Sequence, residues 1–224
     1  MHKYATLCKL SIFGVIIKNS SQFFEVLYTF LVNTPCKLLS FDPLPELNKI
    51  HFAVEACIAR QSLHLKYIYE AIPDHFPELI LTPSRDHQTS PEPQRLDHLW
   101  EHTCFEAFLS SKKSDEYWEL NISPFGDWNL YHFKGYRKAL GREARIPSLS
   151  HFKSDFLQTQ TVRSLEVTID LKSLPLTSEL SLGLTAVLEF QYPVGKTYWA
   201  LKHAGQKPDF HLQESFVLKL KSKT

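Results

Sequence analysis

The chain has 224 residues, with 25 Lys and Arg against 24 Asp and Glu, so its formal net charge at neutral pH is +1. That balance argues against nucleic acid as a partner, because domains that bind a phosphate backbone usually carry a concentrated basic excess. The seven glycines show neither GxGxxG nor GxxxxGKS/T spacing, so the usual nucleotide-phosphate loops are excluded.

Residues 1–34 form an apolar, cationic segment that differs from the rest of the chain. The run 10–17 resembles the hydrophobic part of a secretory signal, but no Ala-x-Ala cleavage site follows it. This run and a second one, 23–32, are both far shorter than the ~18 apolar residues of a membrane-spanning helix. Three interpretations remain open: a degenerate signal or anchor, a docked N-terminal helix, or a start placed too far upstream. We expect the folded domain to span residues 35–224 and to be cytoplasmic, or periplasmic or secreted if the segment acts as a signal.

From Lys49 onward, apolar and polar residues alternate with a period of two, which is typical of half-buried strands. The predicted strands are 50–58, 63–67, 79–81, 103–109, 118–122, 128–133, 165–171, 180–190, 197–201 and 216–220. Residues 83–97, rich in Pro, Ser, Gln and charge, are predicted to form a loop, and residues 135–149 to hold one short helical excursion. The spacing of the strands predicts an all-β fold with a single antiparallel β-sandwich.

The four cysteines, Cys8, Cys36, Cys57 and Cys104, are widely spaced and form no CxxC pair. This spacing favours reduced thiols over a disulfide framework or a structural zinc site, with a Cys57–Cys104 bridge left open.

All four tryptophans lie beside polar residues in three segments, 99–106, 117–132 and 198–211. Indole faces can stack on sugar rings while neighbouring polar side chains bond to hydroxyls, although a tryptophan in a sandwich often simply fills the core. The candidate ligand-binding residues are Trp100, Trp118, Trp128 and Trp199 as stacking platforms, with Glu106, Glu119, Asn121, His132, His203 and Asp209 as hydrogen-bonding partners.

Two of these segments, 100–109 and 117–137, resemble bacterial DOMON-like proteins related to family 9 carbohydrate-binding modules. Residues 197–203 and 208–216 resemble the C-terminal part of that family, so the resemblance covers about residues 35–220. It implies a jelly-roll-like β-sandwich whose relatives bind sugars or haem. The favoured function is therefore a non-catalytic binding domain for a carbohydrate or another polyhydroxylated small molecule, without a cofactor; the sequence indicates no oligomeric state.

Two alternatives use other residues. The first is a haem- or zinc-binding redox module built on His102, His203 and His211. Met1 is the only methionine and lies outside the matching region, so a haem could be held there only by His or Lys, and no CxxCH attachment site occurs. The second alternative is a hydrolase built on His102, Cys104 and Glu106, although residues two apart on a strand sit ~6–7 Å apart, too far for direct proton transfer.

Overall fold

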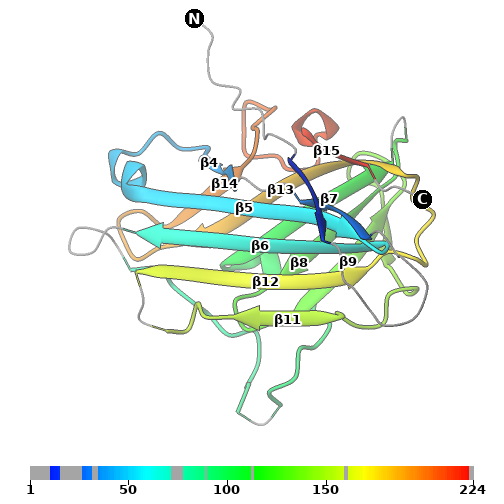
Figure 1. The fold of residues 1–224 in the computed structure, drawn as a ribbon. Helices are drawn as coiled ribbons and strands as arrows, with labels where there is room; N and C mark the ends of the chain where they lie inside the picture. Colours follow the sequence, from blue (N-terminus) through cyan, green and yellow to red (C-terminus); the bar gives the residue numbers. More distant parts are fainter. Residues whose placement is uncertain are drawn as a thin grey trace, which may run out of the picture.

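The protein is a sandwich of two antiparallel β-sheets, seen in a computed structural model (Figure 1). The structure describes residues 11–15, 27–31, 35–71, 78–88, 90–111, 114–158 and 161–221. The all-β class predicted from the alternating pattern is confirmed.

One sheet, called sheet A here, contains seven strands and faces the viewer in Figure 1. Its strand order is β1 (Ser11–Val15), β2 (Leu27–Leu31), β5 (Ile50–Ala59), β6 (Ser62–Ala71), β12 (Val162–Asp170) and β11 (His151–Ser154), with β3 (Cys36–Lys37) also paired to β5. In β5 and β6 every second residue is buried, so these strands have one apolar face toward the core and one polar face outward.

The other sheet, sheet B, contains eight strands. Its order is β10 (Ala139–Arg142), β9 (Trp128–Phe133), β8 (Tyr117–Ile122), β7 (Cys104–Ser111), β13 (Glu179–Glu189), β14 (Lys196–Ala200) and β4 (Leu39–Ser40), with β15 (Leu218–Lys221) also paired to β13. Three short 3-10 turns complete the described structure: η1 (Pro45–Lys49), η2 (Leu99–Glu101) and η3 (Gln213–Ser215). The helical excursion predicted within 135–149 is wrong, because this segment contains strand β10 instead.

Sheet B differs from sheet A because both of its faces are covered. Every residue of β7 and β8 is buried, although their sequences alternate. The inner face packs in the sandwich core, whereas on the outer face Phe108 and Tyr117 pack against Phe210 and Phe216 from the C-terminal part of the chain. Outward-facing polar side chains on β7 and β8 are therefore enclosed.

The described parts of the N-terminal segment are strands. β1 pairs with β2, and β2 pairs with β5 through Phe30 opposite Ile58 and Leu31 opposite Cys57. A docked helix therefore does not occupy residues 11–15 or 27–31, while the rest of 1–34 lies outside the described residues. In the part of the chain that the structure describes, no helix is long and apolar enough to cross a membrane.

Cys57 and Cys104 are both free thiols, so the bridge between them that the sequence left open is not formed. Cys36 is disulfide-bonded, so the expectation of reduced thiols is wrong for this cysteine. Cys57 lies on β5 of sheet A and Cys104 begins β7 of sheet B, so the two cysteines belong to different layers of the sandwich.

Candidate ligand-binding site

The outer face of sheet B carries two adjacent rows of polar side chains. In the first row Thr185, Glu106, Asn121 and Asn129 lie opposite one another across β13, β7, β8 and β9. In the second row Glu119 on β8 lies opposite Tyr131 on β9. Alternation along each strand places both rows on the side opposite the core. We call these six residues the sheet B polar cluster.

Two neutral donors of the cluster bond to its two carboxyl groups. The Thr185 hydroxyl donates to Glu106 Oε2 at 3.1 Å, and Asn121 Nδ2 donates to Glu119 Oε1 at 2.9 Å. The Asn121 side chain is 0% exposed and its Oδ1 has no hydrogen-bond partner among the described residues. A buried acceptor without a donor costs free energy, so this atom marks a place where a donor is missing.

Both carboxyl groups of the cluster are enclosed, at 3% exposure for Glu106 and 6% for Glu119. Burial raises the pKa of Glu119 to about 7, against the hydrogen bond from Asn121 and the more distant charge of Arg137. Burial, followed by the neighbouring Glu119 charge, raises the pKa of Glu106 well above its usual range. Ionising both neighbouring carboxyl groups in a region of low dielectric constant costs free energy because the two negative charges repel each other. The two groups therefore titrate as a pair.

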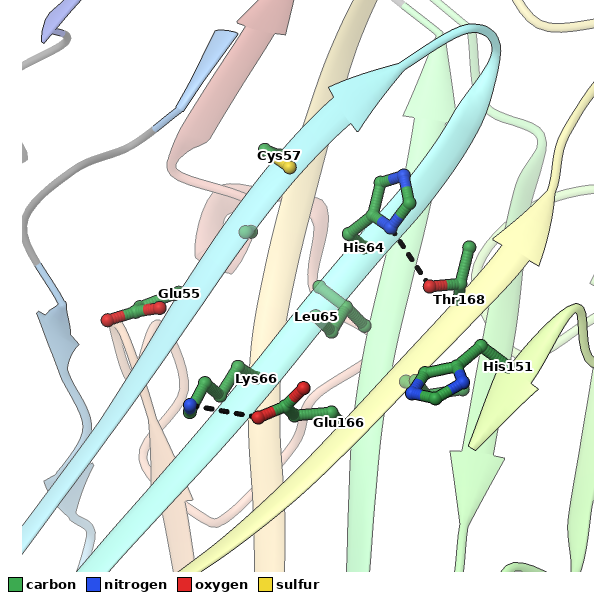
Figure 2. Close-up of a pocket in the computed structure, with 10 residues that line it drawn as sticks. Glu55, Cys57, His64, Leu65, Lys66, His151, Glu166 and Thr168 are labelled. Atoms are coloured by element: carbon green, nitrogen blue, oxygen red, sulfur yellow. Dashed lines mark hydrogen bonds and ion pairs between the residues drawn. The ribbon is translucent and has the colours of Figure 1, made fainter. Parts of the chain in front are cut away.

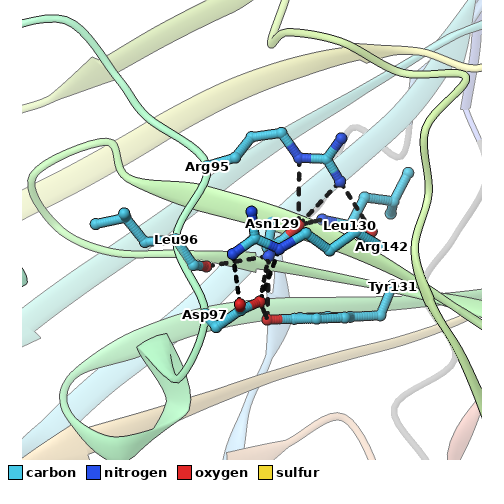
Figure 3. Close-up of polar contacts among 7 residues, drawn as sticks. All are labelled: Arg95, Leu96, Asp97, Asn129, Leu130, Tyr131 and Arg142. Atoms are coloured by element: carbon cyan, nitrogen blue, oxygen red, sulfur yellow. Dashed lines mark hydrogen bonds and ion pairs between the residues drawn. The ribbon is translucent and has the colours of Figure 1, made fainter.

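Asn129 and Tyr131 fix one side of the cluster through a polar network (Figure 3). Asn129 Nδ2 donates to Asp97 Oδ1 at 2.9 Å, and the Tyr131 hydroxyl donates to the same carboxylate oxygen at 2.7 Å. Arg95 donates to Asn129 Oδ1 at 2.9 Å, and Arg142 pairs with Asp97. This network fixes the orientation of both the amide and the phenol.

Trp100, in the turn η2, stands beside this network. Its ring meets Tyr131 edge to face at 5.7 Å between centroids and contacts His98 at 5.2 Å. Trp100 remains 38% exposed, unlike the other three tryptophans. It is therefore the indole that can offer a face to a ligand.

His211 borders the cluster on the Tyr117 side. The Tyr117 hydroxyl accepts the Arg137 backbone N–H at 3.1 Å and lies 2.9 Å from His211 Nδ1. If the hydroxyl donates to Nδ1, the ring hydrogen is on Nε2, which lies 3.8 Å from Glu119 Oε2. Burial, followed by the Arg137 charge, lowers the pKa of His211 to about 4, so this ring is neutral at pH 7.

Asp209 lies at this same border rather than in the cluster. It accepts hydrogen bonds from Tyr136 at 2.5 Å and from Arg137 at 3.0 Å. These contacts tie the C-terminal segment to the loop between β9 and β10.

Three of the four predicted stacking platforms point into the sandwich. Trp118, Trp128 and Trp199 are each 2% exposed and belong to the core. The Trp118 N–H donates to Glu143 at 2.9 Å, and the Trp199 N–H donates to Thr197 at 2.8 Å. Their rings are therefore unavailable for stacking on a ligand, which corrects the role that sequence proximity to polar residues suggested.

Two predicted histidine partners also lie away from the cluster. His132 stacks on Trp118 at 4.5 Å, on the core side of β9. His203 Nε2 bonds to the Leu39 carbonyl oxygen at 2.8 Å and packs edge-on against Phe41.

The residues of the alternative hydrolase do not form a nucleophile and base pair. His102 Nδ1 pairs with Glu189 at 2.9 Å, not with Cys104. Burial, then the Glu106 charge, raises the pKa of the Cys104 thiol well above its usual range, which disfavours the reactive thiolate.

The residues of the alternative metal site are likewise separate. His102, His203 and His211 have different partners, namely Glu189, the Leu39 carbonyl and Tyr117. Over the described ranges, no three His, Cys, Asp or Glu side chains are grouped so that they could hold a metal ion.

A hollow of about 270 Å³ lies on the outer face of sheet A (Figure 2). Cys57, His64, Thr168 and His151 form one row across β5, β6, β12 and β11. His64 Nδ1 lies 2.9 Å from the Thr168 hydroxyl, and in the neighbouring row Lys66 pairs with Glu166 at 2.9 Å. These polar groups already bond across the strands, as is usual on a solvated sheet face.

Thr185, Asn129, Tyr131, Asp97 and Arg95 were not among the residues predicted from the sequence. Asn129 and Tyr131 flank Leu130 in the alternating segment 128–133, so the sequence alone could have predicted that they share one face of the strand. Nothing local in the sequence pairs Thr185 with Glu106, which lies 79 residues earlier.

Comparison with protein-family models gives no match, and comparison with curated proteins gives none either. Among solved structures, the chain is similar to a crystal structure of a protein from Bacteroides uniformis described as a "putative carbohydrate-binding protein". The TM-score is 0.57 at 13% sequence identity, over 83% of this chain and 84% of that one. The likeness shows that the two chains share a fold.

Proposed function

We propose that the sheet B polar cluster binds a carbohydrate or another polyhydroxylated small molecule without converting it chemically. The observation that carries this proposal is the buried Asn121 Oδ1, an acceptor without a donor, beside the Glu106 and Glu119 carboxyl groups. Sugar hydroxyls are hydrogen-bond donors that can satisfy such acceptors.

Trp100 supplies the second element of a sugar site. An indole that remains 38% exposed next to Tyr131 offers an apolar face for a sugar ring, while the cluster offers hydrogen bonds. The fold shared with a protein described as a "putative carbohydrate-binding protein" supports this proposal. So does the resemblance of residues 100–109 and 117–137 to DOMON-like proteins and family 9 carbohydrate-binding modules.

The experiment is calorimetry against a panel of mono- and disaccharides, with wild type and Trp100→Ala. A disaccharide of ~23 non-hydrogen atoms at about 0.3 kcal/mol per atom reaches about −7 kcal/mol, a Kd of roughly 10 μM. Removing the indole is expected to cost about 1–3 kcal/mol, a loss of roughly 5- to 150-fold.

The matched control is Leu157→Ala, which removes an apolar side chain that is 58% exposed in the turn between β11 and β12. It should bind as wild type does. Equal binding by wild type and Trp100→Ala would remove the indole from the site. Failure of every sugar to bind would end the carbohydrate proposal.

A further inference from the structure

The Glu106–Glu119 pair has no cationic partner among the described residues. His211 comes closest, with Nε2 3.8 Å from Glu119 Oε2, but this ring is neutral at pH 7. Arg137 acts on Glu119 only at longer range and is itself hydrogen-bonded to Asp209 at 3.0 Å. Buried carboxylates are normally paired with a cation or kept protonated.

When Glu106 and Glu119 are ionised, the unused hydrogen-bonding capacity of the cluster consists mainly of acceptors. The Thr185 hydroxyl donates its hydrogen to Glu106, and Asn121 Nδ2 donates to Glu119. The wholly enclosed Asn121 Oδ1 has no donor. Two other titratable groups lie beside Glu106. Burial raises the pKa of both the Cys104 thiol and the Tyr67 hydroxyl well above their usual ranges, so both stay protonated, and the Tyr67 hydroxyl donates to the Glu106 carbonyl oxygen. A ligand that binds the ionised pair must therefore bring donors and, preferably, positive charge.

We propose that the ligand of the sheet B polar cluster carries a primary ammonium group, as an amino sugar does, held by Glu106, Glu119 and Asn121 Oδ1. This inference rests on the proposed function and narrows its ligand class. An ammonium has three N–H donors, and charge-assisted bonds to carboxylates are about twice as strong as neutral ones. The nearby rings of Trp100 and Tyr131 suit a cationic sugar because aromatic faces attract cations.

Binding of an ammonium changes the protonation of the pair. Without a ligand, mutual repulsion and burial keep proton on the two carboxyl groups near neutral pH. An ammonium supplies the counter-charge and keeps its own three hydrogens, so the carboxyl groups ionise and their proton passes to the buffer. Ammonium binding therefore releases protons, whereas binding of a neutral sugar does not.

The test is calorimetry of the full chain at pH 6.5 with D-glucosamine, D-glucose and N-acetyl-D-glucosamine, each in two buffers of different ionisation enthalpy. Glucosamine is expected to bind at least about 10-fold more tightly than the other two, since acetylation removes the charge and replaces the ammonium by an amide. The measured binding enthalpy of glucosamine should differ between the two buffers, with the sign expected when the buffer takes up protons. The binding enthalpies of the two neutral sugars should be the same in both buffers.

Glu106→Gln and Glu119→Gln should each reduce glucosamine binding to the level of glucose and reduce the proton release. Glu166→Gln is the control, because it removes a carboxylate that pairs with Lys66 on the outer face of sheet A. If either cluster variant fails to fold, the three-sugar comparison and its buffer dependence on wild type decide the inference.

Three results would overturn the inference. Glucose binding as tightly as glucosamine would refute the ammonium while leaving the proposed function standing. Binding of calcium chloride alone, lost in the cluster variants, would assign the acceptors to a metal ion instead. If none of the three sugars binds, the inference fails; it takes the proposed function with it only if the wider sugar panel also fails.

Discussion

Glu119 is a single carboxyl group whose burial should be visible in the pH dependence of stability. Its pKa is raised to about 7 in the folded protein from an ordinary 4.5, so between these values the folded state holds a proton that the unfolded state has released. The free energy of unfolding therefore falls as pH rises through this window. Glu119→Gln carries no charge and keeps an acceptor for Asn121 Nδ2.

We expect Glu119→Gln to unfold like wild type at pH 4 and to be more stable at pH 8 by on the order of 2–3 kcal/mol. Urea unfolding of both proteins at four pH values measures the difference. The difference, not the wild-type curve, is the readout, because His211, with its pKa lowered to about 4, makes stability rise with pH between about 4 and 6.5. A difference that stays constant with pH would contradict the assignment.

Trp199 and Trp100 have opposite roles despite their similar sequence surroundings. Trp199 is 2% exposed and packs edge-on against Phe52 at 5.7 Å in the core, so Trp199→Ala should cost about 3–5 kcal/mol of folding free energy. Trp100→Ala should cost less than about 1 kcal/mol, since its ring is partly in solvent. Urea unfolding checks both. A Trp199→Ala variant of wild-type stability would contradict the core assignment.

At the scale of elements, β13 holds the C-terminal segment close against the outer face of sheet B. A Cβ added at Gly183 would lie 2.7 Å from Phe216 Cδ1, and Phe216 is part of the cover that packs on Phe108 and Tyr117. We expect Gly183→Ala to destabilise the protein by about 1–3 kcal/mol, because the ring has to move away from β13.

The matched control is Gly135→Ala, where an added Cβ would meet nothing within 4 Å. It should unfold within about 0.5 kcal/mol of wild type. Equal unfolding midpoints for the two variants in urea would show that Phe216 does not depend on close approach to Gly183.

At the scale of the whole molecule, residues 35–224 are predicted to fold without residues 1–34. Among the described residues, the register that joins β2 to sheet A has two residue pairs, Phe30 with Ile58 and Leu31 with Cys57. β5 is paired along its full length with β6, from Ile50 to Ala59. We expect the truncated chain to remain all-β by circular dichroism and to melt cooperatively. A broad, non-cooperative melt would show that the N-terminal segment is required for the fold.

The strands were predictable because alternation is a local property of the chain. The predicted segment 180–190 corresponds to β13 and 128–133 to β9, each within one residue. The prediction of secondary structure was weaker for segments whose conformation depends on pairing with a distant strand. Segment 79–81 forms one isolated bridge, Leu79 with Phe190, and a charged stretch expected to be helical became the edge strand β10 because it pairs with β9.

The sequence also identified part of the candidate site. Glu106, Glu119, Asn121 and Trp100 were predicted, and the structure places the first three side by side and Trp100 beside Tyr131, which lies opposite Glu119. His132, His203 and Asp209 were predicted from proximity in sequence, and they lie elsewhere. His132 stacks on Trp118 on the core side of β9, whereas His203 bonds to the Leu39 carbonyl oxygen and Asp209 to Tyr136 and Arg137.

By itself, the sequence determined which residues share a face of each strand, since side chains alternate with a period of two in any extended chain. It put Trp118 and Glu119 on opposite faces of one strand. Only the tertiary structure decided which of those faces meets the other sheet and which meets the C-terminal segment, because both depend on pairing between distant strands. That choice placed three indoles in the core and enclosed two carboxyl groups on the outer face of sheet B.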